Sequence, residues 1–170
     1  MQQADLIAVY VSLGSNLGDS ENTLAAAHEY LAHLPQVAAI VASSLYLTEP
    51  QDFKEQGWFY NQVLRLDCLP KTTAYQLLEQ LQEIETKLGR VRDTKRRFGP
   101  RVIDLDLLLF GNVCSVDPKL VLPHPRLENR AFVLIPLQEI SPGFILPCGS
   151  SLEYALSKLT FRLDGIKIYQ

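Results

Sequence analysis

Two aspartates stand inside an apolar segment of the chain, in the sequence GPRVIDLDLLLFG at residues 99–111. Residues 102–110 are predicted to form a β-strand, because they are mostly branched or aromatic and lie between Gly-Pro and Gly-Asn turn signals. Alternate side chains of a strand share a face, so Asp104 and Asp106 should point the same way, roughly 7 Å apart. Neighbouring carboxylates repel each other, more strongly when buried. The fold must therefore place positive charge between them.

A cationic loop directly precedes this strand. It covers residues 90–101, RVRDTKRRFGPR, and carries six Arg or Lys residues against one Asp. In the simplest interpretation Arg101 or Arg97 pairs with the aspartates and the rest of the loop is solvated. We favour a second one, because one charge pair does not need so many cations in a net acidic chain. The aspartates are then predicted to bind a divalent metal and the cations to bind phosphate, since Mg²⁺ combines carboxylates with substrate phosphates and Arg binds phosphate bidentately.

Composition narrows the class of protein. A length of 170 residues, 47% of them hydrophobic and 21% charged, predicts one globular domain over 1–170, with a core at about 6–159 and a tail at 160–170 that we leave unassigned. The net charge of -3 argues against general nucleic-acid binding. No apolar run has membrane-spanning length, no signal peptide is recognisable, and the three cysteines form no C-x-x-C motif. We expect a cytoplasmic monomer with neither nucleic-acid nor membrane partners.

The predicted elements follow the order β-α-β-β-α-β. Strands are expected at 6–13, 37–48, 59–68 and 102–110, and helices after a cap at Asp19 or Ser20 and after Thr72 or Thr73. This order is typical of the ferredoxin-like α+β fold, an antiparallel sheet with both helices on one face. Ile103, Leu105, Leu107 and Leu109 should face that core, leaving the other sheet face free for ligands. An extra hairpin and helices at about 130–140 and 151–159 are expected to follow.

Three further features could serve either the fold or a ligand site. GSNLGD, at residues 14–19, is best explained as a strand-to-helix turn that needs glycine, because it lacks the lysine and spacing of a P-loop. His124, between two prolines, either reaches phosphate or is a structural turn histidine. Asn61, near Phe59 on the third strand, is a plausible ligand amide.

These segments together resemble the 6-hydroxymethyl-7,8-dihydropterin pyrophosphokinase family. The resemblance covers residues 7 to about 159 and rests on VSLGSNLGD, SSLYLTEP, FYNQV, GRVR, RFGPRVIDLDLLLFG and LPHPRLENRAFVLIPLQEI. Since nothing resembles a fused synthase or aldolase domain, the monofunctional form is implied. The implied reaction transfers pyrophosphate from ATP to the hydroxymethyl group of 6-hydroxymethyl-7,8-dihydropterin and releases AMP, in folate biosynthesis. Two Mg²⁺ ions are implied, with ATP as co-substrate.

The resemblance also implies roles for individual residues. Asp104 and Asp106 would bind both metal ions and, with Arg90 and Arg101, form the catalytic set. The implied ATP-binding residues are Gln82, Glu85, Arg90, Arg92, Arg97, Arg101, Lys119, His124 and Arg130, together with Leu107 and Val121 through their backbones. The implied pterin-binding residues are Thr48, Glu49, Gln51, Phe59, Asn61, Phe98, Asp104 and Phe132, with the ring between Phe59 and Phe132. Three loops, at about 14–20, 49–58 and 90–101, would close over the substrates.

Two other classes of protein remain open on the residues alone. Another two-metal nucleotidyl transferase would also present paired aspartates and basic residues, but it would need room for a polynucleotide or a cyclising nucleotide. A non-catalytic RNA-binding module on the same fold should show aromatic and basic residues on its central strands, where this chain shows aspartates. AMP formation from ATP that depends on the pterin would separate all three.

Overall fold

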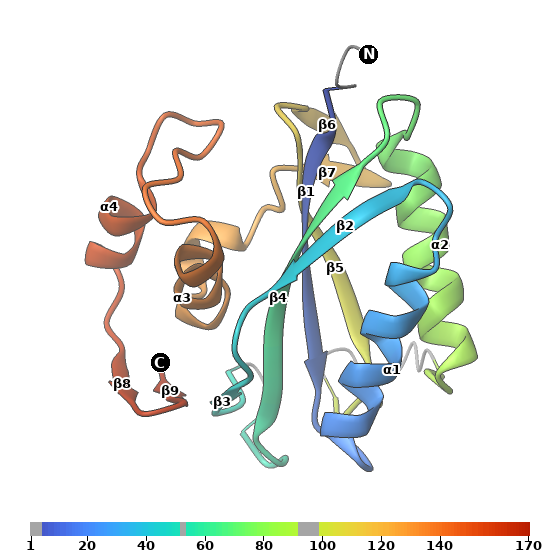
Figure 1. The fold of residues 1–170 in the computed structure, drawn as a ribbon. Helices are drawn as coiled ribbons and strands as arrows, with labels where there is room; N and C mark the ends of the chain where they lie inside the picture. Colours follow the sequence, from blue (N-terminus) through green and yellow to red (C-terminus); the bar gives the residue numbers. More distant parts are fainter. Residues whose placement is uncertain (1–4, 52–53, 92–98) are drawn as a thin grey trace.

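A seven-stranded sheet forms the centre of the computed structural model, which describes residues 5–51, 54–91 and 99–170 (Figure 1). The strand order is β5-β1-β4-β3-β9-β8, and β2 also pairs with β4. The strands of this sheet are β1 Ile7–Ser15, β2 Val37–Ala42, β3 Tyr46–Thr48, β4 Phe59–Cys68, β5 Asp104–Phe110, β8 Arg162–Asp164 and β9 Lys167–Tyr169. The helices are α1 Ser20–Ala32, α2 Ala74–Lys87, α3 Ala131–Ile140 and α4 Leu152–Ser157, and a separate hairpin consists of β6 Ser115–Asp117 and β7 Leu120–Leu122. The predicted α+β class with a ferredoxin-like core is confirmed.

Helices α1 and α2 begin at the expected caps. The side chain of Asp19 accepts a hydrogen bond from the backbone N of Asn22, and that of Thr73 from the backbone N of Gln76. Such bonds satisfy N–H groups that have no partner inside the helix. Both helices then bury their apolar stripes against one face of the sheet, in a core that includes Leu24, Leu31, Leu77, Leu81, Val11, Leu64 and Leu105.

The opposite face is only partly free, which corrects the expectation that all of it is open to ligands. Helix α3 covers its upper part as drawn in Figure 1, α4 packs on the outer side of α3, and a second core includes residues of both helices and of the sheet. Tyr10 and Val63 of the sheet contribute to this core, as do Val133 and Leu134 of α3. Because the sheet has apolar residues on both faces in this region, helices must pack on both faces to remove those residues from water. The lower part, at the Asp104 end of β5, remains accessible.

A register shift in β5 makes one core assignment wrong. On β1, Tyr10 pairs with Leu109 while the next residue, Val11, pairs with Leu107. The extra residue of this β-bulge reverses the alternation of faces beyond it. Leu109 therefore packs in the α3 core, although it was expected beside Leu107, and Phe110 returns to the α1–α2 core. The expected burial of Ile103, Leu105 and Leu107 against α1 and α2 is confirmed.

The single strand expected over 37–48 is also wrong, since it divides into β2 and β3. Ser43 and Ser44 form the break. The backbone N of Val63 donates to Ser43 Oγ at 3.0 Å, and the backbone N of Ser44 donates to Glu139 Oε1 of α3 at 2.9 Å. These side-chain bonds interrupt the regular ladder to β4, although the backbone N of Ser43 still donates to the O of Val63 at 3.0 Å.

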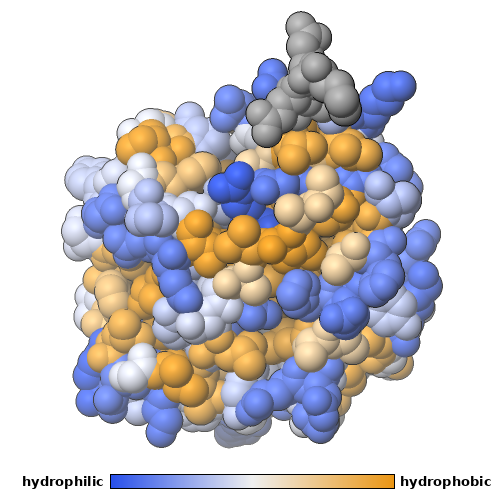
Figure 2. Space-filling model, viewed as in Figure 1, coloured by the Kyte–Doolittle hydropathy of each residue, from blue (hydrophilic) through white to orange (hydrophobic). Residues whose placement is uncertain are grey.

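Strand β2 contributes to the molecular surface. Its residues Ala38, Ala39 and Val41 are exposed, and apolar atoms gather across the middle of the face that Figure 2 shows, where β2 crosses in front in Figure 1. Within the described residues, no helix combines the length and apolar character needed to cross a membrane.

The segment 160–170, left unassigned from the sequence, joins the main sheet. Strands β8 and β9 form an antiparallel hairpin, and β9 pairs in parallel with β3 through Leu47 and Thr48. Figure 1 shows this hairpin beside β3, at the end of the sheet where the accessible face lies.

Candidate active site

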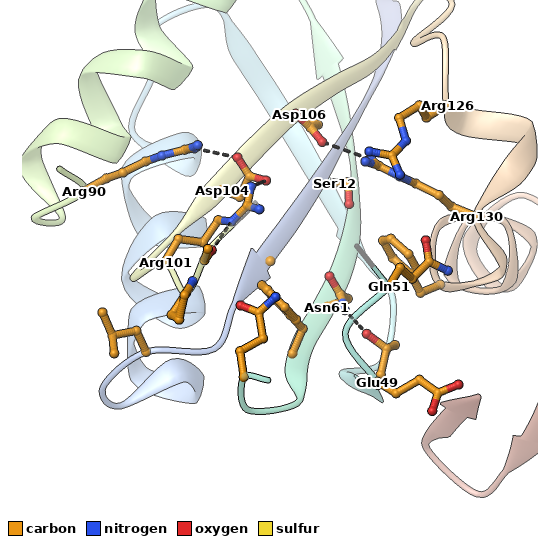
Figure 3. Close-up of a pocket in the computed structure, with 18 of the residues that line it drawn as sticks. Ser12, Glu49, Gln51, Asn61, Arg90, Arg101, Asp104, Asp106, Arg126 and Arg130 are labelled. Carbon is orange, nitrogen blue, oxygen red and sulfur yellow. Dashed lines mark hydrogen bonds and ion pairs between the residues drawn. The ribbon is translucent and has the colours of Figure 1, made fainter. Parts of the chain in front are cut away.

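A cavity of about 770 Å³ lies on the accessible part of the sheet face, at the Asp104 end of β5 (Figure 3). Its volume is in the range typical of small-molecule sites. Many of the residues implied by the family resemblance line it: Thr48, Glu49, Gln51, Phe59, Asn61, Arg90, Arg101, Asp104, Asp106, His124, Arg130 and Phe132. Their segments are distant in the chain, so the fold itself assembles this group.

The two aspartates do share one face of the sheet. Their partners on β1 are Gly14, opposite Asp104, and Ser12, opposite Asp106. Both carboxylates open into the cavity from β5, the edge strand of the sheet (Figure 3). The rigid ladder of β1 and β5 therefore fixes their separation.

Asp104 lies between two arginines. Arg90 Nη1 is 2.5 Å from its Oδ1, and Arg101 Nη1 is 2.5 Å from its Oδ2. The side chain of each arginine is only about a fifth exposed, at 19% and 20%. The simple ion pair foreseen for Arg101 is present, and Arg90 forms a second one. The carboxylate thus holds two guanidinium groups at the cavity wall.

Glu85 supports this arrangement from behind. It is buried in α2, its Oε1 accepts a hydrogen bond from the backbone N of Leu105 at 2.8 Å, and it also pairs with Arg90. Burial alone would lower the pKa of Arg90, but Asp104 and Glu85 together raise it above its ordinary value. Glu85, implied by the resemblance as an ATP-binding residue, lies outside the cavity lining and instead contacts Arg90 and the start of β5.

Asp106 has a different environment. Arg130 Nη1 lies 3.3 Å from its Oδ2, and His124 Nε2 lies 3.9 Å from the same oxygen. Burial, followed by the nearby Asp104 carboxylate, raises the pKa of Asp106 above its usual value, although His124 and Arg130 oppose this rise. A further cation at this carboxylate would therefore be favourable.

The surroundings of His124 favour the neutral form of its imidazole. Burial lowers the pKa of its imidazole, and although Asp106 opposes this, Arg130 and Arg126 add to the lowering. The backbone N of Arg126 donates to His124 Nδ1 at 3.2 Å. A neutral ring that accepts at Nδ1 carries its proton on Nε2. That N–H is the group closer to Asp106, at the cavity side.

At the other end, the cavity carries amide and aromatic groups. Asn61 is buried, and its Nδ2 donates to Thr48 Oγ1 at 2.6 Å. A Cβ atom at Gly14 would lie 3.0 Å from Asn61 Oδ1, a tighter contact than most Cβ atoms make, so a side chain at this position would crowd the amide. Phe59 and Phe132 also line this end and lie beside Arg101 and Arg130 respectively, with ring-to-guanidinium distances of 5.9 and 5.5 Å.

Not all implied residues lie at the cavity. Gln82, Leu107, Lys119 and Val121 are outside its lining, as Glu85 is. Leu107 is buried in the α1–α2 core, whereas Gln82 and Lys119 are exposed on α2 and on the turn between β6 and β7. Arg92, Arg97 and Phe98 lie outside the described residues. The roles of all these residues stay predictions.

The structure adds lining residues that had no assigned role, among them Ser12 and Arg126, while Gly14 and Gln56 lie in the loops 14–20 and 49–58 that were expected to close over the substrates. Ser12 had a signal: it alternates with Tyr10 and Gly14 inside an otherwise apolar strand, which places a polar group on the aspartate face. Gln56 and Arg126 lie in loops with no periodic pattern to mark them.

Asn16 connects the loops around the cavity, a role that the sequence did not suggest. Its Nδ2 donates to Gln56 Oε1 and to the backbone O of Gly57, both at 3.1 Å. Its Oδ1 accepts from the backbone N of Arg101 at 2.9 Å. The turn after β1 is therefore bonded to the loop before β4 and to the residue that pairs with Asp104.

Asp104 and Asp106 fit a metal ion whose remaining ligands come from a bound phosphate compound and water. Within residues 5–51, 54–91 and 99–170, no group of three or more His, Cys, Asp or Glu side chains could hold a metal alone. Asp104 and Asp106 offer oxygen ligands, and Mg²⁺ commonly binds one or two carboxylates together with substrate phosphates and water. The raised pKa of Asp106 also favours a nearby cation. The residues present therefore fit magnesium bound with a phosphate compound.

Comparison with known proteins agrees with this geometry. A sequence model of the family described as 7,8-dihydro-6-hydroxymethylpterin-pyrophosphokinase (HPPK) matches residues 10–142. The chain belongs to this family. Relatives named 2-amino-4-hydroxy-6-hydroxymethyldihydropteridine pyrophosphokinase include one from Methylorubrum extorquens, 43% identical over 150 residues, which are 88% of this chain and 92% of the relative. Another, from Pseudomonas aeruginosa, is 40% identical over 159 residues, 94% of each chain.

Solved HPPK structures share the fold. A Plasmodium falciparum HPPK-DHPS triple mutant crystallised with pteroate superposes with a TM-score of 0.67 at 12% identity. The match covers 92% of this chain but only 44% of the other, so this chain spans less than half the length of that protein. At this identity the similarity concerns the fold of the HPPK part alone.

Proposed function

We propose that this chain transfers pyrophosphate from ATP to the hydroxymethyl group of 6-hydroxymethyl-7,8-dihydropterin, with the cavity at Asp104 as the active site. The single observation that carries the assignment is Asp104 between Arg90 and Arg101, with Asp106 next to it on the same sheet face. Carboxylates and guanidinium groups in one concave site match the needs of a metal–triphosphate complex.

In this proposal the triphosphate lies along the cationic side of the cavity. Arg90 and Arg101 bind phosphate oxygens, and Arg130 and the Nε2–H of His124 add donors beside Asp106. Magnesium bound by Asp104 and Asp106, proposed as two ions, would neutralise phosphate charge and lower the pKa of the pterin hydroxyl. The described cations are already gathered at this wall, so little of the fold needs to rearrange.

The pterin is proposed to lie between Phe59 and Phe132, because flat aromatic rings stack well on each other. Asn61, with its amide fixed by Thr48, would read the hydrogen-bonding edge of the ring. Glu49 and Gln51 line the same end and add polar contacts. This orientation directs the hydroxymethyl group toward Asp104 and the phosphates.

The reaction is a substitution at the β-phosphorus of ATP. The hydroxymethyl oxygen forms a bond to that phosphorus, the bond from the phosphorus to the oxygen bridging to the α-phosphate breaks, and AMP leaves with that oxygen. The hydroxyl proton passes to Asp106 or to solvent. Negative charge develops on the departing oxygen, and Arg101 is proposed to stabilise it, because such charge is where fixed donors contribute most.

We further propose that residues 1–170 act as one pyrophosphokinase unit, monomeric and cytoplasmic, without nucleic-acid or membrane partners. The net charge of -3 supports the absence of nucleic acid. Cys68, Cys114 and Cys148 are free thiols, which is consistent with a reducing compartment.

The test is an assay of nucleotide products. Purified protein is incubated with Mg²⁺ and ATP, with and without 6-hydroxymethyl-7,8-dihydropterin, and products are separated by ion-exchange chromatography. We expect AMP only when the pterin is present, in a one-to-one ratio with pterin diphosphate. Formation of ADP, or AMP formation independent of the pterin, would contradict the proposal.

A further inference from the structure

The β8–β9 hairpin lies beside the aromatic end of the cavity, and its residue Gln170 bonds to both sides of that end. We infer that the hairpin is a positioning element for the pterin, with Gln170 as its central residue. This inference rests on the proposed function, since it assumes that the pterin binds between Phe59 and Phe132.

Gln170 joins three segments through three hydrogen bonds. Its backbone N donates to Glu49 Oε1 at 2.8 Å, and its side-chain Nε2 donates to the backbone O of Asn129 at 2.9 Å. Its Oε1 accepts from the backbone N of Ala131 at 2.7 Å. The residue after β3 is thereby connected to the first residue of α3.

The two connected segments form different walls of the cavity. Glu49 lines one wall, while Arg130 and Phe132 line another, on either side of Ala131 in the sequence. The N–H of Ala131, in the first turn of α3, has no partner inside the helix, so the bond to Gln170 satisfies it. Loss of this bond should loosen the backbone that aims Phe132, and with it the width of the pterin slot, whereas Arg130 keeps its pair with Asp106 at 3.3 Å.

The hairpin can hold Gln170 firmly because β9 continues the main sheet. The backbone N of Leu47 donates to the O of Ile166 at 2.9 Å, and that of Glu49 to the O of Ile168 at 3.4 Å. The Ile168 side chain is 1% exposed. These contacts anchor the strand from which Gln170 projects.

A second contact reaches the segment before β4. The rings of Tyr169 and Trp58 meet edge to face with centroids 5.2 Å apart, and the Arg162 guanidinium lies 4.0 Å from the Tyr169 ring centroid. Trp58 directly precedes Phe59, the other proposed stacking residue. The hairpin therefore contacts both segments that carry the aromatic slot. Trp58 is also the only tryptophan in the chain, so its fluorescence reports on this contact.

The test compares Gln170→Ala with Lys167→Ala, an exposed side chain on β9, which ends one residue before Gln170. Steady-state assays give KM for pterin and for ATP separately, and thermal unfolding checks stability. Gln170→Ala removes two side-chain hydrogen bonds, so we expect its pterin KM to rise about five- to tenfold. Its ATP KM should stay within about twofold, because the phosphate wall keeps its contacts. Lys167→Ala should match wild type, and Trp58 emission should change in Gln170→Ala alone.

Each outcome has a defined meaning. A pterin KM equal in Gln170→Ala and Lys167→Ala would overturn the role of the hairpin, and so would a parallel rise of both KM values, which indicates general loosening. If wild type forms no pterin-dependent AMP, the proposed function fails first, and that result is distinct from either of these.

Discussion

Arg101 donates from Nη1 to Asp104 Oδ2 across 2.5 Å, and both side chains are largely buried at the cavity wall. In the proposed function, the Asp104 carboxylate would also bind the metal ion that accompanies ATP. The guanidinium would then move from the carboxylate to a phosphate, which is a similar charge-assisted partner. The ion pair keeps both charges satisfied and sets the arginine close to where phosphate would lie.

If Arg101 stabilises charge that develops in the reaction, Arg101→Ala should lower kcat far more than it weakens ATP binding. We expect a loss of about 10²–10³ in kcat, the size found when one fixed donor to developing charge is removed, with less than a tenfold change in the Kd for a non-hydrolysable ATP analogue. Stopped assays and calorimetry measure the two quantities. The matched control is Arg65→Ala, which breaks a pair with Asp67 remote from the cavity. A large change in Kd with normal kcat would make Arg101 a binding residue only.

Asp104→Ala and Asp106→Ala should each reduce turnover by at least about 10³-fold at saturating Mg²⁺, since both carboxylates are proposed metal ligands. Neither variant should unfold. Asp106→Ala relieves repulsion between two neighbouring carboxylates, whereas Asp104→Ala should lose some stability because Arg101 loses its carboxylate, although Arg90 keeps Glu85. Circular dichroism and the AMP assay test the two statements together. Near-normal turnover in either variant would show that the metal assignment is wrong.

Asp106 predicts an effect of pH on stability. Its folded pKa is raised above the unfolded value, so its stabilising contribution is complete below the unfolded pKa and is lost as pH rises through the folded pKa. With a chelator present at pH 7, Asp106→Asn should therefore raise Tm by roughly 1–3 °C. Toward pH 4 this gain should shrink, because wild-type Asp106 is then protonated more often. Asp67→Asn, at a partly exposed pair, should show no such gain. If the Asp106→Asn variant were less stable than wild type at pH 7, the raised pKa of Asp106 would be contradicted.

Gly14→Ala should impair the pterin end selectively. The new Cβ would lie 3.0 Å from Asn61 Oδ1, so the amide that donates to Thr48 should shift by a few tenths of an ångström. We expect the pterin KM to rise about tenfold and the ATP KM to change less than twofold. Gly57→Ala is the control, because a Cβ there meets only an ordinary contact at 3.8 Å. If both glycine variants behave alike, Asn61 is not a pterin ligand.

The parts of the fold that depend on local pattern could be predicted from sequence. Alternation placed Asp104 and Asp106 on one face, and the caps at Asp19 and Thr73 fixed the helix starts. Single-residue irregularities could not be predicted in this way. The bulge that turns Leu109 to the other core and the break at Ser43 both depend on partners far away in the chain, such as Tyr10 and Val63.

In the candidate site, too, residues marked by a local pattern could be predicted and residues that depend on distant partners could not. Charged residues in regular strands gave strong signals, and the structure gathers Asp104, Asp106 and Arg101 as expected. Asn16 and Gln170 gave none, because each acts through backbone atoms of segments that only the tertiary fold brings close. A short tail such as 160–170 carries too few residues for a periodic pattern, although its β9 extends the main sheet.

The central claim is that Asp104 and Asp106 bind magnesium together with the phosphates of ATP. The most direct measurement is a calorimetric titration of a non-hydrolysable ATP analogue, with Mg²⁺ and with a chelator, into wild type and into the Asp104→Asn/Asp106→Asn variant. We predict that Mg²⁺ raises the affinity of wild type at least about tenfold, equal to about 1.4 kcal/mol, and that of the variant less than twofold. An equal gain from Mg²⁺ in both proteins would contradict the claim.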